Sequence, residues 1–380
     1  METARETNAP MTSRPAPTPL VASLPATVPF VGPEAQERER GRPFRARLGA
    51  NENGFGPSPR AVEAMKRAAG EVWKYGDPEN HDLRQALAAH YRVRPENIMV
   101  GEGIDSLLGL VVRQYIEADR PVVTSLGAYP TFNYHVAGFG GRLVTVPYED
   151  DRESLEGLLA AVRRENAPLV YLSNPDNPMG TWWDGAEVQR FIEALPETAM
   201  LVLDEAYAET GPASALPPLE PDRPNVLRMR TFSKVYGLAG MRCGYAIGEA
   251  EAIAAFDKVR NHFGMTRMTQ AAALAALEDE AHLRATIGKV AACRERLSAI
   301  AAANGLAALP SATNFVAIDC GADGAYALAV LQALARRDIF VRKPMAPVLD
   351  RCIRVSVGPE EEIALFEEAL PGALADARGN

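Results

Sequence analysis

The chain has 380 residues, nearly half of them hydrophobic, and carries a formal net charge of −9. This length can bury a large core and suggests one large domain with a smaller one beside it. The negative charge argues against a nucleic-acid partner, because phosphate backbones bind basic faces. No apolar run approaches the ~20 residues that a membrane helix needs, and no compact signal-peptide core is present. The four cysteines are scattered, which argues against a disulfide framework or a metal site and fits a cytoplasmic protein.

The pattern along the chain predicts four parts. Residues 1–27 are rich in proline and small residues and are expected to form a disordered arm. Residues 28–57 are expected to join a small C-terminal domain. Over 58–266, short apolar runs alternate with amphipathic stretches, which predicts a large α/β domain whose mostly parallel sheet is sandwiched by helices. Residues 267–380 are expected to form a smaller α+β domain.

The expected elements of the large domain follow from these runs. Strands are predicted at 98–100, 121–125, 143–146, 169–173, 200–203, 226–229 and 243–247. Helices are predicted at 59–70, 105–116, 152–165 and 186–194. In the smaller domain, an alanine-rich helical region is expected at 267–304, strands at 314–318, 339–342 and 353–357, and helices at 324–337 and 359–370.

One of these strands ends in a cluster of functional side chains, Asp204-Glu205-Ala206-Tyr207. Sheets of α/β proteins bind ligands at the carboxyl ends of their strands, so this cluster is a candidate site. Taken alone, Asp204 could equally be the N-cap of a helix.

A second cluster, Thr231-Phe232-Ser233-Lys234, precedes a glycine-rich turn and Arg242. The chain has only six lysines, and the other five lie in amphipathic helices or beside polar turns. A lysine amine can form a Schiff base with a carbonyl when its neighbours tune it. Ser233, Arg242 and the glycine-rich backbone could hold a phosphate beside it.

A third cluster, Asn177-Pro178-Met179-Gly180, follows another strand and by itself indicates a turn. In this order and spacing, the three clusters resemble the signature of the fold-type-I aminotransferases, which use pyridoxal 5′-phosphate. The finer resemblance is to the histidinol-phosphate aminotransferase branch. It rests on the segments 50–53, 73–75, 204–209 and 354–358, and it extends over roughly 30–370.

The resemblance implies a role for each residue around the cofactor ring. Lys234 carries the cofactor and acts as the base for proton transfer. Asp204 pairs with the protonated pyridine nitrogen, and Lys234, Asp204 and Tyr207 are the catalytic residues. Asn177 and Tyr207 bind the phenolic oxygen of the ring, while Tyr129 stacks on its face.

The resemblance also implies how phosphate and substrate are held. Ser233, Arg242, Ile104 and Asp105 bind the cofactor phosphate, together with Tyr75 from the other subunit of a homodimer with shared active sites. The substrate residues are Arg354, for the α-carboxylate, Arg342, for a phosphate on the donor, and Asn51 and Phe30. Phe30 stands where this branch often has a tyrosine.

The implied reaction is transamination between a 2-oxo acid, 2-oxoglutarate, and histidinol phosphate or an aromatic amino acid, in the first case within histidine biosynthesis. A lyase or decarboxylase of the same fold, acting on a phosphorylated amino acid, stays open, because the motifs barely separate these reactions. A nicotinamide dehydrogenase does not fit, since Ser106 replaces the third glycine of its fingerprint. A non-catalytic regulator would need a DNA-binding domain, which a short proline-rich arm cannot supply.

Overall fold

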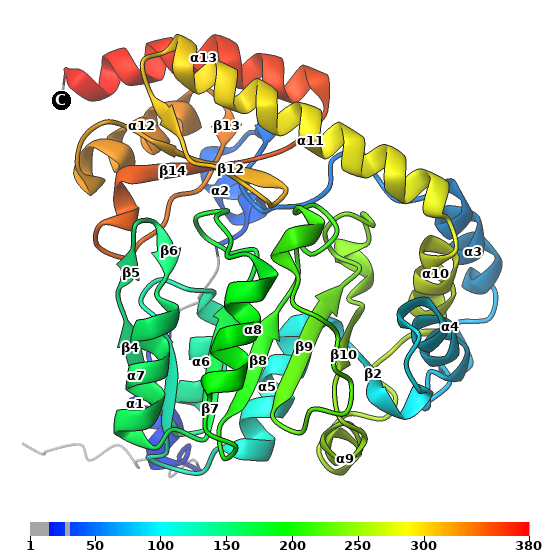
Figure 1. Ribbon diagram of the computed structural model, residues 1–380. Helices are drawn as coiled ribbons and strands as arrows, with labels where there is room; N and C mark the ends of the chain where they lie inside the picture. The colour runs from blue at the N-terminus through cyan, green and yellow to red at the C-terminus, as the bar shows by residue number, and fades with distance from the viewer. Residues whose placement is uncertain (1–14, 27–30, 380) are drawn as a thin grey trace, which may run out of the picture.

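The computed structural model describes residues 15–26 and 31–379. It has a large α/β unit and a smaller unit that covers one end of the large unit's sheet (Figure 1). Helix α11 (Glu280–Ala303) runs from the side of the large unit across to the smaller one. No helix in the described ranges is long and apolar enough to cross a membrane.

A seven-stranded sheet forms the centre of the large unit. Its strands, in spatial order, are β2 (Ile98–Gly101), β10 (Gly244–Ile247), β9 (Val226–Thr231), β8 (Met200–Asp204), β7 (Leu169–Ser173), β3 (Pro121–Ser125) and β4 (Arg142–Val146). Only β10 runs antiparallel to its neighbours. The seven strands predicted here are confirmed, each to within two residues, and so is the mostly parallel α/β fold.

Helices cover both faces of this sheet because alternate residues of a strand point to opposite sides. Leu169 and Tyr171 of β7 face a core formed with α5 (Gly103–Tyr115) and α6 (Pro130–Gly138). The intervening residues of β7 face a second core with α7 (Leu155–Glu165) and α8 (Gly185–Ala194). Strands buried on both faces are nearly continuous apolar runs, which is why the sequence reveals them.

The smaller unit is built on an antiparallel three-stranded sheet. Its elements are β11 (Ala307–Ala308), β12 (Phe315–Asp319), β14 (Cys352–Ser356), α12 (Gly324–Arg336) and α13 (Glu360–Arg378). The N-terminal segment joins it through β1 (Ala46–Arg47), which pairs with β13 (Ile339–Phe340). Before β1, α2 (Pro33–Arg40) ends at Gly41, whose left-handed backbone suits glycine.

The packing changes from one unit to the other later than residue 267, where the smaller domain was expected to begin. Helix α10 (Arg267–Leu277) packs against α3 (Pro59–Ala69) and α4 (His81–Tyr91), and its alanines share a core with β2. The first residue of α11 that packs into the core of the smaller unit is Val290. The single helical region predicted over 267–304 is interrupted at Asp279, whose side chain caps α11.

Part of the N-terminal arm is folded into a short helix. Residues 15–26 contain α1 (Pro19–Ser23), which begins after the capping residue Thr18 and lies near Gly140. The sequence placed this segment in a disordered arm, because proline spacing alone does not show that Pro19 occupies a first helical turn, where proline is tolerated.

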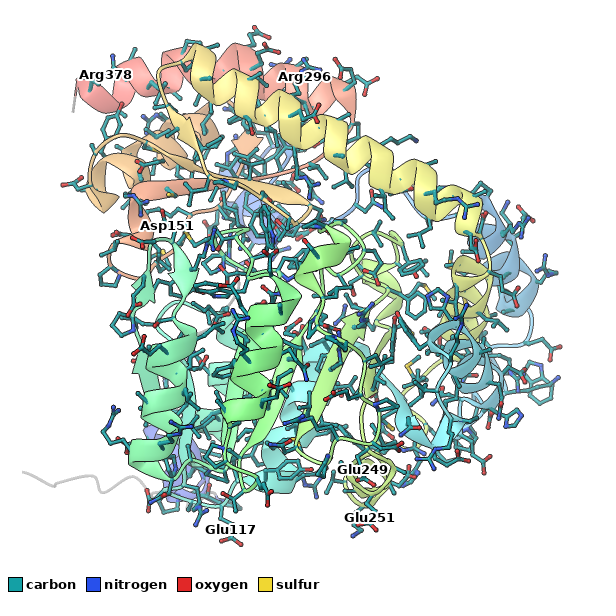
Figure 2. The ribbon with its side chains drawn as sticks, viewed as in Figure 1. Glu117, Asp151, Glu249, Glu251, Arg296 and Arg378 are labelled. Atoms are coloured by element: carbon teal, nitrogen blue, oxygen red, sulfur yellow. The ribbon has the colours of Figure 1, made fainter. Side chains whose placement is uncertain are left out.

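The carboxyl ends of the parallel strands face the smaller unit (Figure 1). The hairpin of β5 (Tyr148–Glu149) and β6 (Arg152–Glu153), which follows β4, reaches that unit. There Arg351 bonds Asp151 at 2.8 Å and Asp319 at 2.7 Å, so one guanidinium joins both units. Figure 2 shows Asp151 at this junction.

Candidate active site

Three of the predicted site residues, Asp204, Tyr207 and Lys234, lie where the sheet meets the smaller unit. Asp204 ends β8, and Lys234 comes three residues after the end of the neighbouring strand β9. The Lys234 amine lies 5.7 Å from the centre of the Tyr207 ring. Neighbouring parallel strands therefore bring the lysine and the Asp204–Tyr207 cluster to one edge of the sheet, as the motif spacing predicted.

Asp204 is a buried carboxylate whose charge is not balanced by a nearby cation. Its two oxygens accept hydrogen bonds from the Tyr171 hydroxyl at 2.7 Å and the Ala206 amide at 3.0 Å. Burial raises the pKa of Asp204 to about 6, although these donors and the more distant Lys234 oppose that rise. Among the described residues, no Lys, Arg or His nitrogen lies within 4.0 Å of it. A protonated pyridine nitrogen would supply the missing positive charge.

The predicted phosphate cradle, which includes Ile104, Asp105 and Arg242, lies around the first turn of α5. The first amides of a helix lack partners within the helix, so its N-terminus attracts anions. Arg242, whose guanidinium lies 3.6 Å from the Asp105 carboxylate, comes so near Gly103 that a Cβ there would be 2.6 Å from its Nη2. Gly103 has a φ of +83°, which also favours glycine. Ile104, Asp105 and Arg242 are thus adjacent, as predicted.

This cradle makes Gly103 a testable position. Gly103→Ala should weaken binding of pyridoxal 5′-phosphate, the cofactor that the resemblance implies, on the order of tenfold, because the methyl group displaces Arg242 and strains the backbone. Fluorescence titration of the apoprotein measures this affinity. Gly288→Ala, at an exposed helical glycine with nothing within 4 Å, is the control and should bind normally. Equal affinity in both variants would show that this turn does not hold the cofactor.

Tyr129 closes another side of the site. Its hydroxyl donates to Asp105 at 2.7 Å, which ties the start of α6 to the first turn of α5. Burial, followed by the Asp105 charge, raises the pKa of Tyr129, so its ring stays neutral. A neutral aromatic ring at this place is suited to stacking on a cofactor, but the stacking itself stays a prediction.

Asn51 holds Tyr207 rather than standing free in the site. Its amide nitrogen donates to the Tyr207 hydroxyl at 3.0 Å, and its amide oxygen accepts from Ser356 at 3.0 Å. As the acceptor in the first bond, Tyr207 keeps its own proton for another partner. The sequence assigned Asn51 to the substrate. The observed contacts show that Asn51 orients the Tyr207 side chain, and its contact with the substrate stays a prediction.

Arg354 has the surroundings of an anion-binding residue. Its Nη1 donates to Asn177 Oδ1 at 2.6 Å, and its guanidinium lies 5.1 Å from the centre of the Phe315 ring. The buried Nε has no hydrogen-bond partner, and no carboxylate of the described residues lies within 4.0 Å of this side chain. Burial lowers the pKa of Arg354 to about 10, which still leaves it protonated at neutral pH. A substrate carboxylate would complete its hydrogen bonding.

Arg342 lies directly opposite Arg354. The two backbones exchange hydrogen bonds across an antiparallel bridge, so the side chains project from the same face. β13 ends two residues before Arg342, so this arginine is in a bridge and not in the strand expected over 339–342. Its Nη1 donates to the Val31 carbonyl at 2.8 Å. Phe30, the neighbouring residue, lies outside the described residues, and its predicted role is untested.

Tyr75 is not brought to Lys234 by any contact within the described part of the chain. Its side chain is 76% exposed, and its ring packs 4.8 Å from that of Phe263. Exposure of this ring is what a residue that acts in a neighbouring subunit requires.

Several residues of the site were missed from the sequence. Tyr171 bonds Asp204, Phe315 lies beneath Arg354, and Ser356 holds Asn51. A buried pair of carboxyls, Glu153 and Asp176, lies nearby, and burial raises the pKa of Asp176 to about 7. The one signal was a tyrosine inside an aliphatic strand, because a buried Tyr hydroxyl needs a partner.

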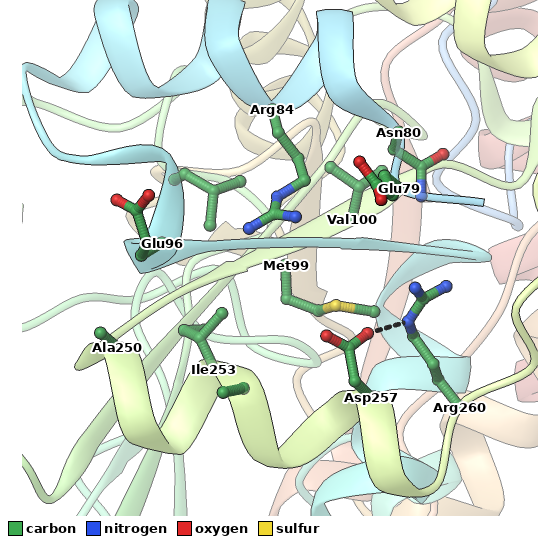
Figure 3. A pocket seen from close by; sticks show the side chains of 12 residues that line it. Glu79, Asn80, Arg84, Glu96, Met99, Val100, Ala250, Ile253, Asp257 and Arg260 are labelled. Atoms are coloured by element: carbon green, nitrogen blue, oxygen red, sulfur yellow. Dashed lines mark hydrogen bonds and ion pairs between the residues drawn. The ribbon is translucent and has the colours of Figure 1, made fainter. Parts of the chain in front are cut away.

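A cavity of about 180 Å³ elsewhere in the large unit is separate from this site. It lies between α4, the edge strand β2 and α9 (Ala250–Ala254), where Figure 3 shows the side chains of Arg84, Met99 and Arg260 lining it. None of the predicted site residues lines this cavity.

Comparisons with known proteins agree with this arrangement. The family model for aminotransferase class I and II matches residues 46–370. A histidinol-phosphate aminotransferase of Anaeromyxobacter sp. (strain Fw109-5) is 37% identical over 351 residues, covering 90% of this chain and 95% of that protein. A histidinol-phosphate aminotransferase of Roseiflexus castenholzii (strain DSM 13941 / HLO8) is 36% identical, and the match covers 92% of this chain and 96% of that protein.

Solved structures give the same result. The histidinol-phosphate aminotransferase from Sinorhizobium meliloti, crystallised in complex with pyridoxal-5′-phosphate, superposes with a TM-score of 0.93 at 60% identity. The match covers 96% of this chain and 99% of that one. The lyase, the regulator and the dehydrogenase that the sequence brought into consideration are not favoured by these relatives. The chain therefore belongs to the class I and II aminotransferase family, in its histidinol-phosphate aminotransferase branch, and is a pyridoxal-phosphate-dependent aminotransferase.

Proposed function

We propose that this chain transfers the amino group of histidinol phosphate to 2-oxoglutarate. The observation that carries the proposal is the pair of opposed arginines, Arg342 and Arg354, over the carboxyl ends of the sheet. Histidinol phosphate has a phosphate and no carboxylate, whereas glutamate and 2-oxoglutarate have two carboxylates. Two guanidiniums on one face can bind either kind of anion, because planar donors match both groups. The relatives reported above carry the name of this activity.

The residues around the site supply the other requirements of transamination. When bound, pyridoxal 5′-phosphate supplies a carbonyl that can link to an amine and a ring that withdraws electrons from the carbon bearing the amino group. In this proposal Lys234 holds the cofactor and then moves the proton at that carbon, since its amine is tethered beside it. Asp204 holds the ring nitrogen protonated, and Tyr207 and Asn177 orient the ring.

Arg342 provides the test of the donor. Arg342→Ala should lower kcat/KM for histidinol phosphate about 10- to 100-fold, because a charge-assisted hydrogen bond contributes ~1.5–3 kcal/mol. Phenylalanine, which brings only an α-carboxylate for Arg354, should change less than about threefold. Steady-state kinetics with both donors, in wild type and in the exposed-residue control Arg190→Ala, measure the difference. Equal losses for the two donors would remove the case for a phosphorylated substrate.

An aromatic amino acid is the second candidate donor. Phe30 offers no hydroxyl at a position where this branch often has a tyrosine, so the contact that the resemblance implies for this residue would be apolar. A neutral hydrogen bond lost there costs only ~0.5–1.5 kcal/mol, less than Arg342 supplies. We therefore expect phenylalanine to react as well, but with a lower kcat/KM than histidinol phosphate.

We also propose that the active unit is a homodimer with shared sites. Four large apolar side chains, Val72, Trp73, Tyr75 and Phe263, are exposed, and the rings of Tyr75 and Phe263 pack 4.8 Å apart, which suits contact with a second copy of the chain. The free state of all four cysteines fits a reducing compartment such as the cytoplasm.

Hybrid dimers test the shared site. Lys234→Ala and Tyr75→Ala subunits should each be impaired alone, and exchange between them should restore about a quarter of all sites by statistical pairing. Activity after mixing, followed by size-exclusion chromatography with differently tagged subunits, measures both exchange and rescue. Demonstrated exchange without any regained activity would contradict a site built from two chains.

A further inference from the structure

We infer that Tyr171 is a positioning residue of the site: its hydroxyl holds the Asp204 carboxylate in place and ionised for the ring nitrogen of pyridoxal 5′-phosphate. The inference rests on the role proposed above for Asp204. It concerns a residue that no motif contains and that the proposed reaction does not otherwise use.

The strand register places this tyrosine beside the carboxylate. Tyr171 of β7 pairs with Val202 of β8, so Asp204 is its diagonal neighbour two residues further on. Aromatic side chains span that separation between strands. The Tyr171 hydroxyl reaches Asp204 Oδ2 at 2.7 Å, while the Ala206 amide takes the other oxygen. One donor on each oxygen fixes the plane of the carboxylate.

The tyrosine itself has little freedom to move. Tyr171 is fully buried, and the Phe132 ring stacks on it at 4.7 Å with an interplanar angle of 22°. Burial, with a further contribution from the Asp204 charge, raises the pKa of Tyr171 well above its ordinary value. The proton therefore stays on Tyr171, which makes this hydroxyl a permanent donor to Asp204.

Loss of that donor would change the charge at the ring nitrogen. The Tyr171 hydroxyl, the Ala206 amide and the charge of Lys234 favour the ionised form of Asp204, whereas the Asp105 charge opposes it. The buried carboxyls Glu153 and Asp176 also interact with the Asp204 charge. Without the hydroxyl, the pKa of Asp204 rises further, so more of this carboxyl is protonated at neutral pH. The carboxylate then competes for the proton that the ring nitrogen must keep, and the ring withdraws electrons less strongly.

Nitrogen NMR on the full-length holoenzyme tests this directly. The probe is pyridoxal 5′-phosphate labelled with ¹⁵N in the ring, bound to wild type, Tyr171→Phe and Phe132→Leu. In wild type the resonance should lie at the protonated position. In Tyr171→Phe it should move towards the unprotonated position at the same pH. Phe132→Leu disturbs the same packing but removes no hydroxyl, and its resonance should stay with wild type.

Cofactor affinity gives a second measurement on the apoproteins. Tyr171→Phe should weaken binding of pyridoxal 5′-phosphate about tenfold, which corresponds to ~1.4 kcal/mol. Binding of the 1-deaza analogue, which has C–H in place of the ring nitrogen, should change less than about threefold. A merely structural role would weaken both ligands alike and would overturn the inference.

An Asp204→Asn control distinguishes failure of the role inferred for Tyr171 from failure of the role proposed for Asp204. If wild type shows a protonated ring nitrogen that Asp204→Asn abolishes and Tyr171→Phe leaves untouched, the role of Tyr171 is wrong and that of Asp204 stands. If the wild-type nitrogen is unprotonated and Asp204→Asn changes nothing, the proposed role of Asp204 fails, and that of Tyr171 with it.

Discussion

Replacing Lys234 by alanine should lower kcat for transamination by at least ~10³-fold, because a positioned general base alone contributes ~10²–10⁴-fold and this lysine is also expected to hold the cofactor. Lys234 lies at the carboxyl edge of the sheet, with its amine 5.7 Å from the centre of the Tyr207 ring, whereas the other five lysines lie outside the clusters 204–207 and 231–242. Single-turnover kinetics with glutamate measure the loss.

Borohydride reduction followed by peptide mapping should place the cofactor adduct on Lys234 in wild type and on no residue in Lys234→Ala. The matched control is Lys258→Ala, at an exposed lysine of the large unit, which should keep both the adduct and the activity. An adduct on any other lysine of the wild-type protein would overturn the assignment of the whole site.

Arg354→Ala should lower kcat/KM for glutamate and for 2-oxoglutarate by about 10²–10³-fold. Removing one partner of a buried ion pair costs ~3–5 kcal/mol, because the other charge is left desolvated and unpaired. Arg354 meets the conditions for that cost: it lies between Asn177 and Phe315, and its buried Nε has no hydrogen-bond partner among the described residues.

The conservative variant makes this prediction sharper. Arg354→Lys keeps the charge but lacks the planar fork, so it should recover only part of the lost kcat/KM. Cofactor affinity of both variants should match wild type, because Arg354 is assigned to the substrate and not to the phosphate cradle at α5. A variant that keeps wild-type kcat/KM within about threefold would show that the carboxylate binds elsewhere.

The sequence predicted the sheet and the residues at its edge from local patterns. β7 and β8 are short apolar runs because both of their faces are buried. Asp204 ends such a run and Lys234 follows the next predicted strand, and parallel strands present their carboxyl ends at a common edge. Local pattern was therefore enough to bring these two residues together without knowledge of the register.

The sequence could not predict which side chains meet across that edge. The bond from Tyr171 to Asp204 depends on the register of β7 on β8, and the opposition of Arg342 and Arg354 depends on a single bridge. Neither is encoded in the spacing of residues along one strand. The same holds for Asn51, whose partners Tyr207 and Ser356 lie on other elements far along the chain.

What the sequence by itself determined is the order of the strands along the chain, the α/β class and the chemistry of its motifs, because each follows from composition and period over a few residues. Only the tertiary structure decided where one unit ends. Helix α11 is continuous, although its first residues pack in the core shared with β2 and its later residues pack in the core of the smaller unit. No break in the helical pattern of the sequence indicates where this change occurs. Only the tertiary structure explains the two arginines inside the buried strand β9. Arg228 and Arg230 are tolerated there because the buried Glu205 pairs with both, and that pairing exists only once the strands have come together.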